Sequence, residues 1–167
     1  MDETPQEYSQ RLIRTLAGGE PLEILQSTIT ELEALVQPLT EERLRLPRAP
    51  GQWSAAQILS HLAEGEIVFG YRLRMILSSD GAPIQAYDQD IWAKNSGYLQ
   101  DDPALALNLF RVMRSTNLSW LRSLQPEQWN YAGIHSERGR ESIADMARLT
   151  AGHDINHLKQ LKSISSL

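Results

Sequence analysis

The chain has 167 residues, 41% of them hydrophobic, which is enough for one folded domain over residues 1–167 with a sizeable core. Sixteen basic and twenty-one acidic residues give a net charge of −5 without any basic tract, so we expect neither a nucleic-acid partner nor a membrane partner. The chain contains no cysteine, which excludes disulfides, thiolate metal ligands and a protein thiol nucleophile.

The first predicted element is a short leading helix over residues 5–17, ended by the pair Gly18 and Gly19. The residues before it lack the basic and apolar segments of a signal peptide, and no apolar stretch is long enough to span a bilayer, so we expect a cytoplasmic protein. A long helix is predicted over residues 21–37, followed by a proline-rich loop over residues 39–50. Its apolar stripe consists of Leu22, Leu25, Ile29, Leu32 and Val36.

Three further long helices are predicted. The first covers residues 54–77 and begins with a serine N-cap. Residues 82–102 form a long irregular section, and loops of that length are often functional. The next helix opens at Asp102 and is closed by Pro126, and the last one opens near Ser142.

These elements predict an all-α fold, a four-helix bundle with a short extra N-terminal helix. The four long helices are of similar length, which is typical of a bundle. The only residues with strand character lie around Trp129–His135, so we expect no sheet larger than a hairpin.

Two histidines, His153 and His157, lie four residues apart on the last predicted helix. That spacing stacks them on one helix face, where both rings can converge on one ion. They continue the apolar stripe of Ile143 and Met146, so both rings are expected to point into the bundle. The alternative is one packed core histidine and one solvent-facing histidine. A metal ion would satisfy the polar atoms of both rings.

His61 is the candidate for a third ligand, at the border of the inward face of its helix. The alternative is an ordinary boundary histidine beside Glu64. Three imidazoles without a thiolate suit zinc, nickel, iron or copper rather than magnesium or calcium. Three protein ligands also leave coordination positions open, which is the arrangement of a catalytic metal site.

Four other residues are weaker candidates. Glu64 and Asp88 are candidates for proton relay, although a solvated carboxylate is the favoured interpretation of each. Trp92, in the same irregular section as Asp88, is a candidate wall of the pocket. His135 is expected to be a loop histidine that holds the entrance of the last helix.

The sequence resembles the DinB-like superfamily of bacterial proteins, and the resemblance covers nearly the whole chain. It implies a metal held by one histidine of the second long helix and by the histidine pair of the last one. In this sequence those positions are His61, His153 and His157. The resemblance also implies a homodimer, and it includes branches that transfer thiols such as bacillithiol or mycothiol, or that isomerise maleylpyruvate. The matching segments are 53–62, 88–92 and the ending with His135, Gly139, Ser142, Ile143 and 153–161.

From these observations we expect a divalent-metal-dependent enzyme, first of all a thiol S-transferase that acts on small electrophiles with a low-molecular-weight thiol cosubstrate. A metal-dependent hydrolase is the alternative enzyme. A non-enzymatic metal-binding dimer with a ligand-sensing or stress role is the alternative outside catalysis. We expect zinc or nickel, with iron as a further option, and a small-molecule substrate. No catalytic side chain is assigned.

Overall fold

The computed structural model describes residues 3–165, and helices dominate it. No helix within these residues is long and apolar enough to cross a membrane. In chain order the elements are α1 (Pro5–Arg14), α2 (Pro21–Val36), α3 (Glu41–Arg45), α4 (Ala55–Ser78), β1 (Ala82–Ile84), α5 (Gln89–Asn95), α6 (Pro103–Arg122), the 3-10 helix η1 (Pro126–Asn130), β2 (Ala132–His135), β3 (Gly139–Ser142) and α7 (Ile143–Ser165).

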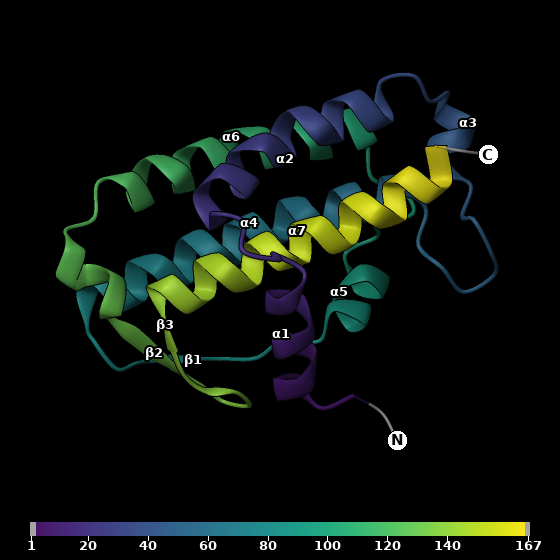
Figure 1. The fold of residues 1–167 in the computed structure, drawn as a ribbon. Coiled ribbons are helices and arrows are strands. Elements are labelled where there is room, and N and C mark those ends of the chain that lie inside the picture. Colours follow the sequence, from purple (N-terminus) through teal and green to yellow (C-terminus); the bar gives the residue numbers. More distant parts are fainter. Residues whose placement is uncertain (1–2, 166–167) are drawn as a thin grey trace.

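The bundle consists of the long helices α2, α4, α6 and α7 (Figure 1), which confirms the predicted fold class. Helix α4 packs against α6 and α7, and α2 packs against α6 and α7. Their inward faces form two buried apolar clusters, one around Phe110 and Leu161 and the other around Leu73 and Ile143. Two of the shorter helices, α1 and α5, lie together below the middle of the α4–α7 pair (Figure 1).

Local sequence signals fix where the long helices begin. The hydroxyl of Ser54 accepts from the amide of Gln57, and the Gln57 side chain accepts from the amide of Ser54, which is a complete capping box for α4. Asp102 caps α6 through the amide of Ala104, with proline at the first helical position. The predicted starts at residues 54, 102 and 142 therefore agree with the structure.

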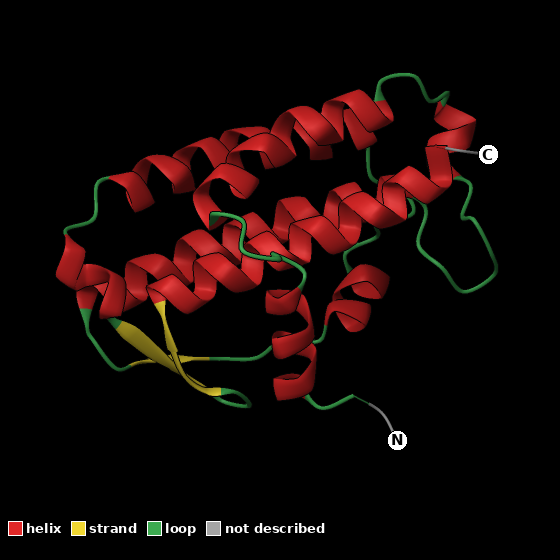
Figure 2. Cartoon of the chain, viewed as in Figure 1, coloured by secondary structure: helices red, strands yellow, loops and turns green. Residues whose placement is uncertain are grey.

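The predicted absence of any sheet larger than a hairpin was wrong. Strand β2 pairs with β3 in an antiparallel hairpin, and β1 adds to the other edge of β2 in parallel (Figure 2). The parallel pair joins Pro83 to Ile134, so the information that specifies it is distant in the sequence. A three-residue strand also has too few positions to show an alternating pattern.

Three shorter segments also differ from the prediction. The leading helix ends at Arg14 instead of continuing to residue 17, because the chain turns through positive φ at Ala17 and Gly18. The predicted loop over residues 39–50 contains α3, and the predicted irregular section contains both β1 and α5. Each of the helices α3 and α5 is too short to show a helical period, so only their N-caps identify them.

Helix α1 docks on α7 through a small residue. Leu12 is 1% exposed, and its backbone lies directly against Gly152. A Cβ at position 152 would overlap the carbonyl oxygen of Leu12 and lie 2.6 Å from its carbonyl carbon. Glycine at this position therefore lets α1 approach α7 immediately beside His153.

Candidate metal centre

The structure brings the three predicted histidines together. His61 extends from α4, and His153 and His157 extend from α7, one helical turn apart. Their candidate ligand atoms all lie within 4.8 Å of one another. His61 and His157 are buried, and His153 keeps partial exposure. His61, which the sequence placed at the border of the inward face, is only 2% exposed.

The geometry of the nitrogen atoms suits ligation of one ion. The Nε2 atom of His153 lies 2.9 Å from Nε2 of His61 and 3.1 Å from Nε2 of His157. Two ligands at the usual Zn–N distance on a tetrahedral ion would be separated by about 3.3 Å. One proton on Nε2 of His153 can serve only one of these two neighbours, whereas a cation can accept all three lone pairs. The chemistry of the donor set therefore fits a divalent transition metal.

Burial keeps the three imidazoles in the neutral form that binds metals. Burial lowers the pKa of His61 to about 3, with a further contribution from His157. It lowers the pKa of His157 to about 4, although the hydrogen bond to Gln160 opposes this shift. The pKa of His153 is also far below its usual value because of burial and the two neighbouring rings. Protons therefore compete little for these nitrogens at neutral pH.

Neighbouring side chains orient the rings. The Oε1 atom of Gln160 lies 2.7 Å from Nδ1 of His157, so Nδ1 carries the proton and Nε2 presents its lone pair. The indole ring of Trp53 lies 4.9 Å from the ring of His61 and stacks at 6.5 Å on His157, with 9° between the planes of the stacked pair. These contacts limit the rotation of His61 and His157.

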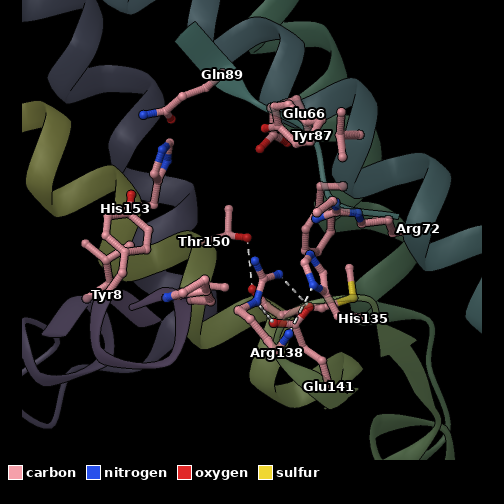
Figure 3. A pocket seen from close by; sticks show the side chains of 18 of the residues that line it. Tyr8, Glu66, Arg72, Tyr87, Gln89, His135, Arg138, Glu141, Thr150 and His153 are labelled. Carbon is pink, nitrogen blue, oxygen red and sulfur yellow. Dashed lines mark hydrogen bonds and ion pairs between the residues drawn. The ribbon is translucent and has the colours of Figure 1, made fainter. Parts of the chain in front are cut away.

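Two cavities lie next to the cluster. His61 and His153 line one of about 390 Å³, and His157 and Trp53 line another of about 530 Å³. Tyr8 of α1 and Gln89 of α5 line both cavities. Figure 3 shows the side chains of Tyr8 and Gln89 near His153 in the first cavity. The short helices α1 and α5 therefore border the accessible side of the histidine cluster.

The weaker candidates are placed differently. Glu64 is half-buried and accepts a hydrogen bond of 2.5 Å from the hydroxyl of Tyr98, and Asp88 caps α5. Neither carboxylate lines the two cavities beside the histidines. Trp92 lines a separate cavity and packs its ring 4.4 Å from that of Tyr87. The predicted irregular section over residues 82–102 does border the histidine cluster, but it does so through residues next to Asp88 and not through Asp88 itself.

His135 is not a loop histidine. It is the last residue of β2, it is 2% exposed, and its Nδ1 accepts from the backbone amides of Glu137 and Arg138. It therefore stabilises the turn between β2 and β3 rather than the entrance of α7. That entrance is held by Ser142, which is paired with Asp145.

A buried ionic network behind the histidines was missed. Arg114 of α6 donates to Asp154 at 2.5 Å and to Glu66 at 2.8 Å, and all three side chains are at least 97% buried. Asn117 donates to the second carboxylate oxygen of Glu66. Burial raises the pKa of Asp154, and the charge of Arg114 opposes that shift. The sequence does contain a signal, because Arg114 lies on the apolar stripe between Phe110 and Asn117.

Comparison with known proteins adds to this geometry. A family model of the DinB superfamily matches residues 24–161. The protein named "Putative metal-dependent hydrolase OB0413" of Oceanobacillus iheyensis is 24% identical over 147 residues, which cover 86% of this chain and 82% of that protein. "Putative metal-dependent hydrolase OB0782" of the same organism is 27% identical over 148 residues, 84% of this chain and 86% of the relative.

A solved structure has the same fold. YfiT from Bacillus subtilis, described as a probable metal-dependent hydrolase with an unusual four-helix bundle topology, superposes with a TM-score of 0.81 at 21% identity. The match covers 87% of this chain and 84% of that one. This chain and YfiT thus share a four-helix-bundle fold, and the three similar proteins are named as putative or probable metal-dependent hydrolases.

Proposed function

This chain belongs to the DinB superfamily, and we propose that it is a metal-dependent hydrolase of small molecules whose ion is held by His61, His153 and His157. The observation that carries the proposal is the convergence of three neutral, oriented imidazoles beside two cavities. The names of the relatives support the same reaction class. Zinc and nickel are the metals that best suit three nitrogen ligands.

A divalent ion bound there would supply a Lewis acid and bring the pKa of a bound water to about 7. The protein contributes the rest of the site. Gln160 fixes the tautomer of His157, and Trp53 shields two of the rings from water. Burial raises the pKa of Tyr8, so its phenol stays protonated and can donate a hydrogen bond to a substrate oxygen between the two cavities.

Thiol transfer, the first expectation from the sequence, uses the same centre with a thiol in place of water. The resemblance of the sequence supports it, but no contact among residues 3–165 favours a thiol over water. Hydrolysis is therefore the proposed reaction, and thiol transfer is the competing outcome of the same assay.

The test compares zinc-loaded protein, chelator-treated protein and the His157→Ala variant. Each is assayed with ester and amide substrates in water, and with small electrophiles in the presence of low-molecular-weight thiols. We expect hydrolysis by the zinc-loaded protein alone. Equal turnover in all three preparations would contradict a metal-dependent mechanism, and turnover only with a thiol would replace hydrolysis by thiol transfer.

Metal content provides an independent readout. Elemental analysis should find one zinc per chain in the wild type and little in His153→Ala. The control is His135→Ala, which removes the chain's remaining histidine outside the cluster. If His135→Ala and His153→Ala lose metal equally, the ion is not held by the cluster.

A further inference from the structure

The end of the 390 Å³ cavity away from His153 is lined by two arginines. Arg72 extends from α4, and Arg138 lies in the turn between β2 and β3. Figure 3 shows Arg72, Arg138 and Glu141 on one side of the cavity, and Tyr8 and His153 on the other. One cavity therefore joins a histidine cluster to a pair of guanidinium groups.

Within residues 3–165, Arg138 is paired with a carboxylate and Arg72 is not. Glu141 accepts from both Nε and Nη2 of Arg138 at 3.0 Å, which neutralises that arginine. Arg72 donates Nη2 to the carbonyl oxygen of Gln85, a neutral acceptor, and its guanidinium lies 5.7 Å from the centre of the Tyr87 ring, a weak cation–π contact. No carboxylate among residues 3–165 lies within 4.0 Å of this guanidinium. Glu137, on the same turn as Arg138, also lines the cavity but is exposed to solvent, so Arg72 is the cation of this end that lacks a direct ion-pair partner in the described part of the chain.

Arg72 has limited access to water to compensate for this charge. Burial lowers the pKa of Arg72, and the nearby charge of Arg138 lowers it further. His135 adds no negative charge, and Glu141 is occupied by its fork with Arg138. Of the other carboxylates along the cavity, Glu3 is paired with Arg11, Glu66 and Asp154 are paired with Arg114, and Glu137 is exposed to solvent. A half-buried cation without an anionic partner, on the wall of a cavity, is costly unless a ligand supplies the anion.

We propose that the arginine end of this cavity binds a carboxylate group of the substrate, with Arg72 as the main donor and the remaining Nη1 of Arg138 as the second. This inference deepens the proposed hydrolase and rests on it for the reacting end of the substrate. A guanidinium matches a carboxylate with two parallel hydrogen bonds, which is the strongest form of this contact.

The lining between the two ends defines the rest of the ligand. Leu62, Val68, Phe69 and Met146 also line the cavity, so part of its wall is apolar. The volume of about 390 Å³ limits the ligand to a compact molecule. The substrate class is therefore a small carboxylic acid whose hydrolysable bond is separated from the carboxylate by a short hydrocarbon segment.

The experiment measures binding of glutarate by calorimetric or NMR titration. Metal-free protein is used first, so that the carboxylate cannot bind simply as a metal ligand. The comparison probes are glutaramide, which has the same length without charge, and inorganic phosphate. We expect saturable binding of glutarate and none of glutaramide.

Variants assign the binding to Arg72. Arg72→Met should weaken glutarate binding at least about tenfold, because a charge-assisted pair of hydrogen bonds is lost. Arg72→Lys keeps the charge without the fork and should lose less, and it replaces Arg72→Met if that variant does not fold. The matched control is Arg74→Met, the same charge change on the same helix at an exposed position that stacks on Trp120.

The outcomes separate this inference from the proposed function. Equal effects of Arg72→Met and Arg74→Met, or binding of phosphate without glutarate, would overturn the carboxylate site. Arginine-dependent binding of glutarate by a protein that takes up no zinc would support the carboxylate site and contradict the hydrolase. Zinc affinity is expected to be unchanged in Arg72→Met, since Arg72 is not among the candidate metal ligands.

Discussion

Replacing Gly152 by alanine should loosen α1 from the bundle. The added Cβ would overlap the carbonyl oxygen of Leu12 and lie 3.2 Å from its Cβ, and backbone atoms cannot move aside as the end of a side chain can. Helix α1 must therefore shift or detach from α7. Gly65→Ala is the matched control, because it also lies inside a long helix and its added Cβ would have nothing within 4 Å.

The expected loss of stability in Gly152→Ala can be worked out from the packing of α1. Overpacking of this kind costs about 1–3 kcal/mol. The loss of stability cannot exceed the free energy needed to detach α1 from α7, because detachment removes the overlap. Detachment would expose Leu12 and lose about 1.5–3 kcal/mol of the free energy gained by its burial. Both variants gain up to about 1 kcal/mol from the helix propensity of alanine. We therefore expect Gly152→Ala to be less stable than Gly65→Ala by about 1–3 kcal/mol.

Two measurements check this expectation. Thermal unfolding should show a Tm for Gly152→Ala lower than that of Gly65→Ala by about 2–4 °C per kcal/mol. Amide hydrogen exchange should become faster in residues 5–14, while the centres of α4 and α7 keep their protection. If the two variants have equal Tm values and residues 5–14 exchange as in the wild type, the close approach of α1 to α7 is wrong.

Three further predictions concern the histidine cluster and the buried ionic network around Arg114. His153→Ala and His157→Ala should each abolish tight zinc binding, measured by titration against a chelating dye, because two remaining imidazoles hold the ion weakly. In the metal-free protein, the depressed pKa values of His61 and His157 mean that the unfolded state takes up protons first, so their contribution to stability is complete above pH 6.5. It is lost as the pH falls towards 4, by up to about 1.4 kcal/mol per pH unit for each histidine, which denaturant titrations at several pH values would measure. Arg114→Met should lower the free energy of unfolding by about 3–5 kcal/mol, because Asp154 and its partner carboxylate stay buried without a cation. An unfolding midpoint unchanged from that of the wild type would contradict the ionic network.

The long helices and the histidine cluster were predictable because their signals are local. The apolar stripes repeat every three to four residues, and the caps at Ser54 and Asp102 mark the starts of α4 and α6. His153 and His157 share a face through their spacing alone. His61 was placed only at the border of its helix, because its burial depends on α7 packing against α4, which no local pattern contains.

The elements that were missed depend on contacts between distant residues. Strand β1 exists because Ala82–Ile84 pairs with residues 133–135, and no three-residue pattern announces that pairing. Arg114 has an anomalous position on an apolar stripe, but its two carboxylate partners come from α4 and α7. The arginine end of the cavity likewise needs a residue of α4 and a turn residue more than sixty positions later in the chain.

The parallel pairing of β1 with β2 also sets an order on folding. The pair closes a long loop that contains α5 and α6, and the entropy cost of that closure is not recovered until α6 has docked against α4. We therefore expect the α4–α6 contact to form early and the sheet to form late. Ile84, which is 3% exposed, is a suitable probe of the late step. Ile84→Val should accelerate unfolding and leave the folding rate nearly unchanged, because a contact made after the transition state affects only the unfolding rate.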